Sequence, residues 1–236
     1  MSEAEPRRRP RTIGVVILVA IGLLALAIIA SLSLDKGDTD PIEIEGAQEV
    51  QKRFGGIRQE GDSLGDEDAP VVVQVLNDMQ CERCADFQRE SIDPLVEPYV
   101  RTGDVRLEYH HYALGDRPVG VAYTVAESAG LQGYQWQYVD LFFINQDEAQ
   151  GAISKEFVDQ LAAATTPGAE FNIEQWQRDN ESQEVEDLVM EDGDYTAELR
   201  LTADPAVIVE SETQTKTLED APSLEEIEAA IEEVGG

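Results

Sequence analysis

A short apolar run that ends just before two closely spaced cysteines constrains the fold of this chain more than any other feature. Residues 71–76 (VVVQVL) are mostly β-branched and predict a buried strand. Cys81 and Cys84, the only cysteines among the 236 residues, follow at the point where a helix over 81–99 should begin. Pro94 lies inside this span and is expected to kink it. The pattern therefore predicts a strand, a tight turn and a helix that carries both thiols.

The patterns that follow predict an α/β fold with a block of helices in its middle. Apolar residues alternate in the next strand and then recur at a spacing of three or four, before a closing pair of strands and an amphipathic helix. The expected elements are a strand at 105–114, helices at 119–133, 134–146 and 153–165 with helical character continuing to about 194, strands at 206–211 and 213–218, and a helix at 222–234. Ser223 and Glu226 form a capping box at the start of that last helix.

The N-terminus indicates that most of the chain is exported. Residues 13–34 are uncharged, and as a helix of about 33 Å they would cross a bilayer. The arginines before them should stay in the cytoplasm, so the chain after Leu34 lies outside it. A cleaved signal peptide has a similar layout, but its apolar region is shorter, roughly 7–15 residues. We therefore expect a single-pass membrane protein with an uncleaved signal-anchor.

These signals divide the chain into four parts. Residues 1–12 form a basic cytoplasmic N-terminus, and residues 13–34 form the transmembrane anchor. A linker is expected at 35–60, with a short amphipathic helix at 43–54, followed by the main folded domain at 61–236. The first part of that domain, up to Pro70, is rich in glycine and acids and predicts turns.

The exported part is strongly acidic. The net charge of the whole chain is −32 and its sequence pI is about 4.1, which argues against nucleic acid as a partner because phosphates would be repelled. The acids are spread along the chain and are most simply a solvated surface. Adaptation to high salt, which would screen their mutual repulsion, stays open as an alternative.

The cysteine pair allows three interpretations: half of a zinc site, a structural disulfide or a redox switch. A structural zinc needs about four ligands, and the only histidines, His110 and His111, are neighbours in a predicted strand. Their side chains should therefore point to opposite faces, one to the core and one to solvent. A role as a proton shuttle near the thiols is a less favoured alternative. A structural disulfide between Cys81 and Cys84 would close a very small loop and add little stability.

The redox interpretation explains the position of the pair as well as its spacing. Cys81 would lie at the N-terminus of a helix, where unpaired N–H groups and the helix dipole favour a thiolate. Cys81 would then be the exposed attacking thiol, and Cys84, one turn further, the shielded resolving thiol. We find no phosphate-binding glycine loop, no Ser-His-Asp pattern and no convincing metal cluster, so the favoured interpretation includes neither a cofactor nor a metal.

Residues 64–87 (LGDEDAPVVVQVLNDMQCERCADF) resemble the motif LGxxxAPVxxxxFxDxxCPYCxxF of the DsbA-like thioredoxin-fold proteins. Residues 105–114 resemble the family's next strand, and the helical block resembles its helical insertion. The resemblance covers about 61–234. It implies a thioredoxin fold with an inserted helical subdomain at about 116–200, and thiol–disulfide exchange on exported proteins.

The same resemblance implies roles for particular residues. Cys81 would be the nucleophile and Cys84 the resolving cysteine. Pro205, in DPAVIV at 204–209, falls at the family's cis-proline loop, where it would lie beside the disulfide and present backbone groups to a substrate strand. Cis bonds are accessible mainly before proline, so the residue type fits. Asp78 matches the acid of the FxDxxC pattern.

The sequence departs from the family pattern at the redox pair itself. Glu82 and Arg83 stand between the cysteines, where proline and an aromatic residue or histidine are common, and Asp204 precedes the proline, where threonine or valine is common. The carboxylates of Glu82, Asp78 and Asp204 would disfavour a thiolate at Cys81, and Arg83 would offset them in part. We expect a weaker oxidant than a pair with proline and histidine between the cysteines, and the direction of electron flow stays open.

The leading hypothesis is thus a membrane-anchored extracytoplasmic thiol–disulfide oxidoreductase. Its partners would be cysteine-containing exported proteins, a membrane or extracytoplasmic redox protein that resets the pair, and the membrane itself through residues 13–34. The alternative, of a different class, is a non-catalytic thioredoxin-like module that binds polypeptide or metal.

Overall fold

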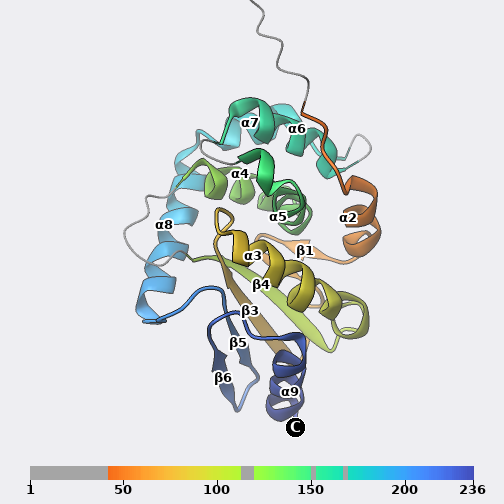
Figure 1. Cartoon of the computed structure of the whole chain (residues 1–236), viewed down its shortest axis with the longest axis vertical. Coiled ribbons are helices and arrows are strands. Elements are labelled where there is room, and N and C mark those ends of the chain that lie inside the picture. The colour runs from red at the N-terminus through yellow and green to blue at the C-terminus, as the bar shows by residue number, and fades with distance from the viewer. Residues whose placement is uncertain (1–41, 113–119, 150–152, 167–169) are drawn as a thin grey trace, which may run out of the picture. The chain divides into compact units, whose positions relative to one another are not determined.

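The computed structural model describes residues 42–112, 120–149, 153–166 and 170–236 (Figure 1). The helices and strands over these residues are α2 (Ala47–Phe54), β1 (Gln59–Glu60), β2 (Ser63–Leu64), β3 (Val71–Asn77), α3 (Glu82–Phe87), η1 (Gln88–Ile92), η2 (Asp93–Leu95), η3 (Val96–Val100), β4 (Val105–His111), α4 (Val121–Gly130), α5 (Gln135–Ile144), η4 (Gln146–Ala149), α6 (Lys155–Thr165), α7 (Ile173–Asp179), α8 (Gln183–Glu198), β5 (Ala206–Glu210), β6 (Thr215–Leu218) and α9 (Leu224–Gly235).

The described strands form one mixed sheet in the order β1-β2-β4-β3-β5-β6. β3 and β4 run parallel, with Val71 beside Val105 and Asn77 beside His111, and all other neighbours are antiparallel. Helices α4 to α8 come between β4 and β5 in the chain (Figure 1). The predicted α/β fold with a helical block is therefore confirmed. The β1–β2 hairpin was not predicted, and it extends the sheet beyond β4.

The two faces of the sheet carry different cores. Val73 of β3 lies beside Leu107 of β4 and Val209 of β5, and all three belong to the main apolar core. On this face α9 contacts β3, β5 and η1. The opposite face carries a small core of Leu76, Tyr112, Ala206 and Ile208. This division follows from the alternation of side chains along a strand.

The chain after the cysteines is helical without a break from Glu82 to Val100, close to the predicted 81–99. After α3 it continues as the π-helical turn η1, the tighter 3₁₀ turn η2 and a second π-helical turn, η3. Pro94 lies near the start of the tight turn η2, and it has no N–H to donate to a carbonyl of the preceding turn. The predicted irregularity at Pro94 is thus present as a change of helix type.

Residues 42–60 pack on the main domain, although 35–60 was expected to be a linker. Val50 and Phe54 of α2 are completely buried, and the Phe54 ring lies 6.3 Å from that of Trp136. Arg53, also on α2, forms ion pairs with Asp93 of η2 and Asp140 of α5. The compact unit therefore begins at Ile42.

No helix in the described part of the chain is long and apolar enough to cross a membrane. The predicted anchor at 13–34 lies outside the described residues.

Candidate active site

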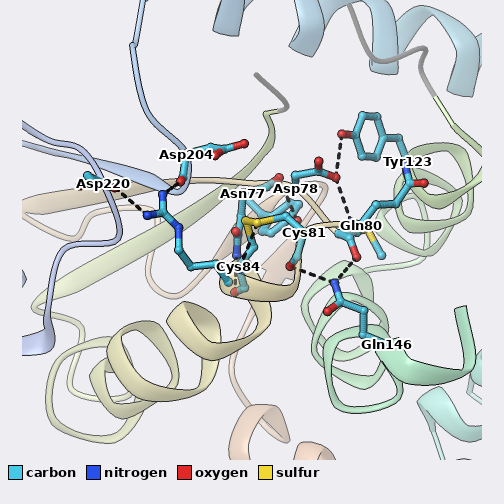
Figure 2. Close-up of a disulfide and its surroundings, with 12 residues drawn as sticks. Asn77, Asp78, Gln80, Cys81, Cys84, Tyr123, Gln146, Asp204 and Asp220 are labelled. Carbon is cyan, nitrogen blue, oxygen red and sulfur yellow. Dashed lines mark hydrogen bonds and ion pairs between the residues drawn. A yellow bond between two sulfur atoms is a disulfide. The ribbon is translucent and has the colours of Figure 1, made fainter. Parts of the chain in front are cut away.

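Cys81 and Cys84 form a disulfide at the start of α3, with their Cα atoms 5.1 Å apart (Figure 2). Cys81 is the N-cap residue, and its sulfur accepts a hydrogen bond from the Cys84 N–H at 3.2 Å. Cys81 is half-buried, whereas Cys84 is completely buried. An attacking group from outside can therefore approach the Cys81 sulfur and not that of Cys84, which is the order of exposure that the sequence predicts.

Asp78 shapes the turn between β3 and α3 from a fully buried position. One carboxylate oxygen accepts hydrogen bonds from the Gln80 N–H at 2.9 Å and from the Tyr123 hydroxyl at 3.2 Å (Figure 2). The Asp78 carbonyl accepts from the Cys81 N–H at 3.0 Å. Asp78 thus links the cysteine turn to helix α4 of the insertion.

Gln146, the first residue of η4, contacts the same turn from the segment that follows α5. Its side-chain amide donates to the carbonyls of Met79, at 2.7 Å, and Cys81, at 3.0 Å (Figure 2). Sequence reasoning did not identify this residue. Sixty-five residues separate it from Cys81, and a lone glutamine carries no local pattern that would show the contact.

Arg83 links α3 to the loop that contains Pro205. Its guanidinium donates to the backbone carbonyl of Asp204 and to the Asp220 carboxylate, the latter at 2.6 Å. The Asp204–Pro205 peptide bond is cis, as the family resemblance implies, and Pro205 is buried. The Pro205 carbonyl accepts from the Ala221 N–H at 3.0 Å. One cation thus joins the cysteine helix, the cis-proline loop and the loop before α9.

The acidic residues expected near the cysteine pair differ in how far they are buried. Glu82 is exposed, while Asp204 is half-buried, and Arg83 contacts the carbonyl of Asp204. Burial raises the pKa of Tyr112, and the nearby charges of Asp204 and Glu219 raise it further. The phenol therefore stays protonated and donates to the Leu201 carbonyl at 3.0 Å.

His110 and His111 point to opposite faces of the sheet, as predicted, but His110 does not face solvent. Its side chain is 11% exposed beneath α8, where Nδ1 lies 2.6 Å from the Asp192 carboxylate. Burial lowers the pKa of His110, but the hydrogen bond to Asp192 and its charge outweigh burial and raise it.

His111 is buried on the other face of the sheet, where it contacts helix α4 of the insertion. Its ring stacks on that of Tyr123 at 4.4 Å, and Nε2 lies 3.0 Å from Glu127. The two imidazoles are thus paired with carboxylates of different helices, an arrangement that fits a structural role better than a proton shuttle.

No three His, Cys, Asp or Glu side chains in the described ranges are grouped so that they could bind a metal ion.

The sheet, the helical insertion, the disulfide at a strand-to-helix junction and the adjacent cis-proline define a thioredoxin-fold protein with a CxxC disulfide. A family model described as thioredoxin matches residues 58–233, about three quarters of the chain. The chain belongs to the thioredoxin family.

Relatives and solved structures agree with this assignment. The chain is 25% identical over 200 residues to a probable disulfide bond formation protein D of Bacillus anthracis, covering 84% of this chain and 86% of the relative. The corresponding protein of Bacillus cereus is 24% identical over 199 residues, covering 83% and 84%.

Two crystal structures share the fold. Oxidised BdbD from Bacillus subtilis matches with a TM-score of 0.58 at 19% identity, over 75% of this chain and 95% of that one. Wolbachia pipientis alpha-DsbA1 matches with a TM-score of 0.62 at 17% identity, over 74% and 90%. The predicted resemblance to DsbA-like thioredoxin-fold proteins is confirmed.

Proposed function

We propose that this protein is a thiol–disulfide oxidoreductase that acts on exported proteins by cycling the Cys81–Cys84 pair. The observation that carries the proposal is the unequal exposure of the two sulfurs at the start of α3. A substrate can reach one sulfur while the other is kept for the internal reaction. The names of the Bacillus relatives support the same class of activity.

The chemistry needs only thiols and the disulfide. A substrate thiolate attacks the Cys81 sulfur, the Cys81–Cys84 bond breaks, and Cys84 leaves as a thiolate. A second substrate thiolate then attacks the substrate sulfur of the mixed disulfide and releases the Cys81 thiolate. Two electrons pass from the substrate to the pair, and the two protons of the substrate thiols go to solvent or to the new thiolates. The same steps in reverse reduce a substrate disulfide.

One backbone group assists the Cys81 sulfur as it gains charge. The Cys84 N–H already donates a hydrogen bond to this sulfur at 3.2 Å. A hydrogen bond to a thiolate is stronger than one to a neutral sulfur. The cis-proline loop would bind a substrate strand through its backbone groups. Asp204 and Pro205 are the residues of this loop that would lie next to the substrate. The carboxylates of Asp204 and Glu82 oppose a thiolate, which favours a weaker oxidant than a pair without nearby acids.

Residues 13–34 would anchor the protein in the cell membrane, with residues 1–12 in the cytoplasm and the catalytic domain outside. The arginine-flanked apolar run supports this topology. A membrane or extracytoplasmic redox partner would return the pair to its starting state. Protease treatment of intact cells should degrade the domain and leave the N-terminal residues protected.

The direct test is to trap the intermediate. In a Cys84→Ser variant the resolving thiol is missing, so mixed disulfides between Cys81 and substrate proteins should accumulate and disappear on reduction. Cys81→Ser is the matched control and should trap none. A pair that neither oxidises nor reduces a model dithiol peptide would overturn the proposal, and peptide binding without turnover would indicate a non-catalytic module.

The reduction potential would decide the direction. A value near about −120 mV is typical of an oxidase, and one near about −270 mV is typical of a reductase.

A further inference from the structure

We propose that Gln146 is a positioning residue by which the helical insertion tunes the redox pair, because it fixes the Cys81 peptide unit against the start of α3. The inference rests on the proposed redox function and deepens it. It assigns a part of the reaction to a segment that carries no cysteine.

The contact is specific to the turn. The single amide nitrogen of Gln146 donates to two carbonyls, those of Met79 and Cys81, which lie on either side of Gln80. Both distances are short, at 2.7 and 3.0 Å, and both acceptors are backbone groups that no substitution in the turn would remove. Gln146 thereby binds the backbone of the turn, not one of its side chains.

The position of Gln146 is itself well determined. The neighbouring Asn145 is buried, and its side chain accepts from the Glu45 N–H at 2.8 Å and donates to the carbonyls of Glu45 and Leu141. These bonds tie the end of α5 to the chain before α2. Gln146 therefore extends toward the cysteine turn from a fixed backbone, which a flexible surface glutamine would not do.

The Cys81 peptide unit decides how well the sulfur is stabilised. The Cys84 N–H donates to the Cys81 sulfur at 3.2 Å and lies 3.1 Å from the Cys81 carbonyl oxygen. The Cys81 carbonyl oxygen is also an acceptor of Gln146. A rotation of this peptide unit would move the sulfur away from the N–H, and Gln146 opposes that rotation.

The effect should differ between the two redox states. In the oxidised protein the disulfide itself confines Cys81, so the loss of Gln146 changes little. In the reduced protein that covalent bond is gone, and Gln146 is then a contact from the insertion that acts directly on the Cys81 carbonyl and keeps the Cys81 thiolate on its donor. A contact that stabilises the reduced state more than the oxidised state makes the disulfide a stronger oxidant.

The test is the equilibrium of the full-length protein with glutathione. Gln146→Met keeps the length of the side chain and removes both donors. We expect its equilibrium to shift about tenfold toward the disulfide form, a potential about 30 mV more negative. The pH at which the Cys81 thiolate forms, followed by its ultraviolet absorbance, should rise by about one unit. Gln146→Asn keeps the donors on a shorter side chain and should shift both values less.

The matched control is Gln177→Met on α7, an exposed glutamine whose side-chain hydrogen bond is to Asp159, away from the turn. It should leave both values unchanged. A purely structural role for Gln146 would weaken the oxidised and reduced proteins equally and leave the potential where it is, so an unchanged potential and thiolate titration in both Gln146 variants would overturn the inference. A wild-type pair that failed to equilibrate with glutathione would overturn the proposed function first.

Discussion

The two sides of the Cys81–Cys84 disulfide are held by different kinds of interaction. On the side of the helical insertion, Asp78 is completely buried and bonded to Tyr123. On the side of the cis-proline loop, the side chains of Arg83 and Asp220 are 50% and 72% exposed. Buried hydrogen bonds are costly to break because the freed groups lose their partners, whereas exposed ion pairs contribute little and are screened by salt. The insertion side should therefore fix the turn, and the loop side should yield when a substrate binds.

The largest effect should come from breaking the insertion side at its centre. Asp78→Ala leaves the Gln80 N–H and the Tyr123 hydroxyl without this acceptor, and we expect a loss of about 3 kcal/mol in the free energy of unfolding, measured in urea. Tyr123→Phe removes one donor and keeps the ring that stacks on His111, so it should lose only about 1 kcal/mol. Equal losses in the two variants would mean that the carboxylate does not organise the turn.

A second buried cluster lies further along the same helical stretch and should give the protein a pH-dependent stability. Burial raises the pKa of Asp93 to about 6 despite its ion pair with Arg53, and it also raises the pKa of Asp140. The folded protein thus keeps a proton that the unfolded chain releases near pH 4. The stabilisation is present at low pH and is lost as the pH rises through about 6.

Asp93→Asn should remove the part of this dependence that Asp93 contributes, while the buried Asp140 keeps its own. Between about pH 4.5 and about pH 7.5 the wild type should lose about 2 kcal/mol more than the variant, since two pKa units correspond to about 2.7 kcal/mol. Thermal or urea unfolding across this range would measure it, with the exposed Glu156→Gln as control. Parallel profiles for wild type and Asp93→Asn would show that Asp93 keeps no proton.

The smallest effect should come from the loop side. Arg83→Ala should lower the free energy of unfolding by less than about 1 kcal/mol at low salt, and the difference should vanish near about 1 M salt, where the screening length is about 3 Å. Arg89→Ala, which removes a surface ion pair with Asp86 away from the loop, is the control. A loss with Arg83→Ala that persisted in high salt would mean that this side is as firmly fixed as the other.

The sequence was sufficient for the parts of the site that lie in one continuous segment. β3, the turn and the first turns of α3 follow directly from the β-branched run, the cysteine spacing and the family motif, because each depends on neighbours within a few residues. Pro205 was found through the motif alone. The cation that reaches its loop is that of Arg83, some 120 residues earlier.

The contacts that could not be predicted join distant segments. β1 and β2 are only two residues each, too short to show a strand period, and they exist because Ser63 and Leu64 pair with β4. The sequence of α2 predicts an amphipathic helix, but it does not predict which surface of the domain its apolar face packs against. Tyr123 and Gln146 reach the turn only because the insertion packs over it, and neither residue type marks such a contact in advance.

If residues 13–34 span the bilayer, as proposed, the docking of α2 would also limit how far the disulfide can travel. In that case only residues 35–41 would separate the span from the compact unit, which begins at Ile42. Seven residues reach at most about 25 Å when fully extended. The catalytic domain would then search a thin layer next to the membrane surface, where polypeptides emerging from the bilayer and membrane-embedded redox partners are encountered far more often than proteins that have already diffused away.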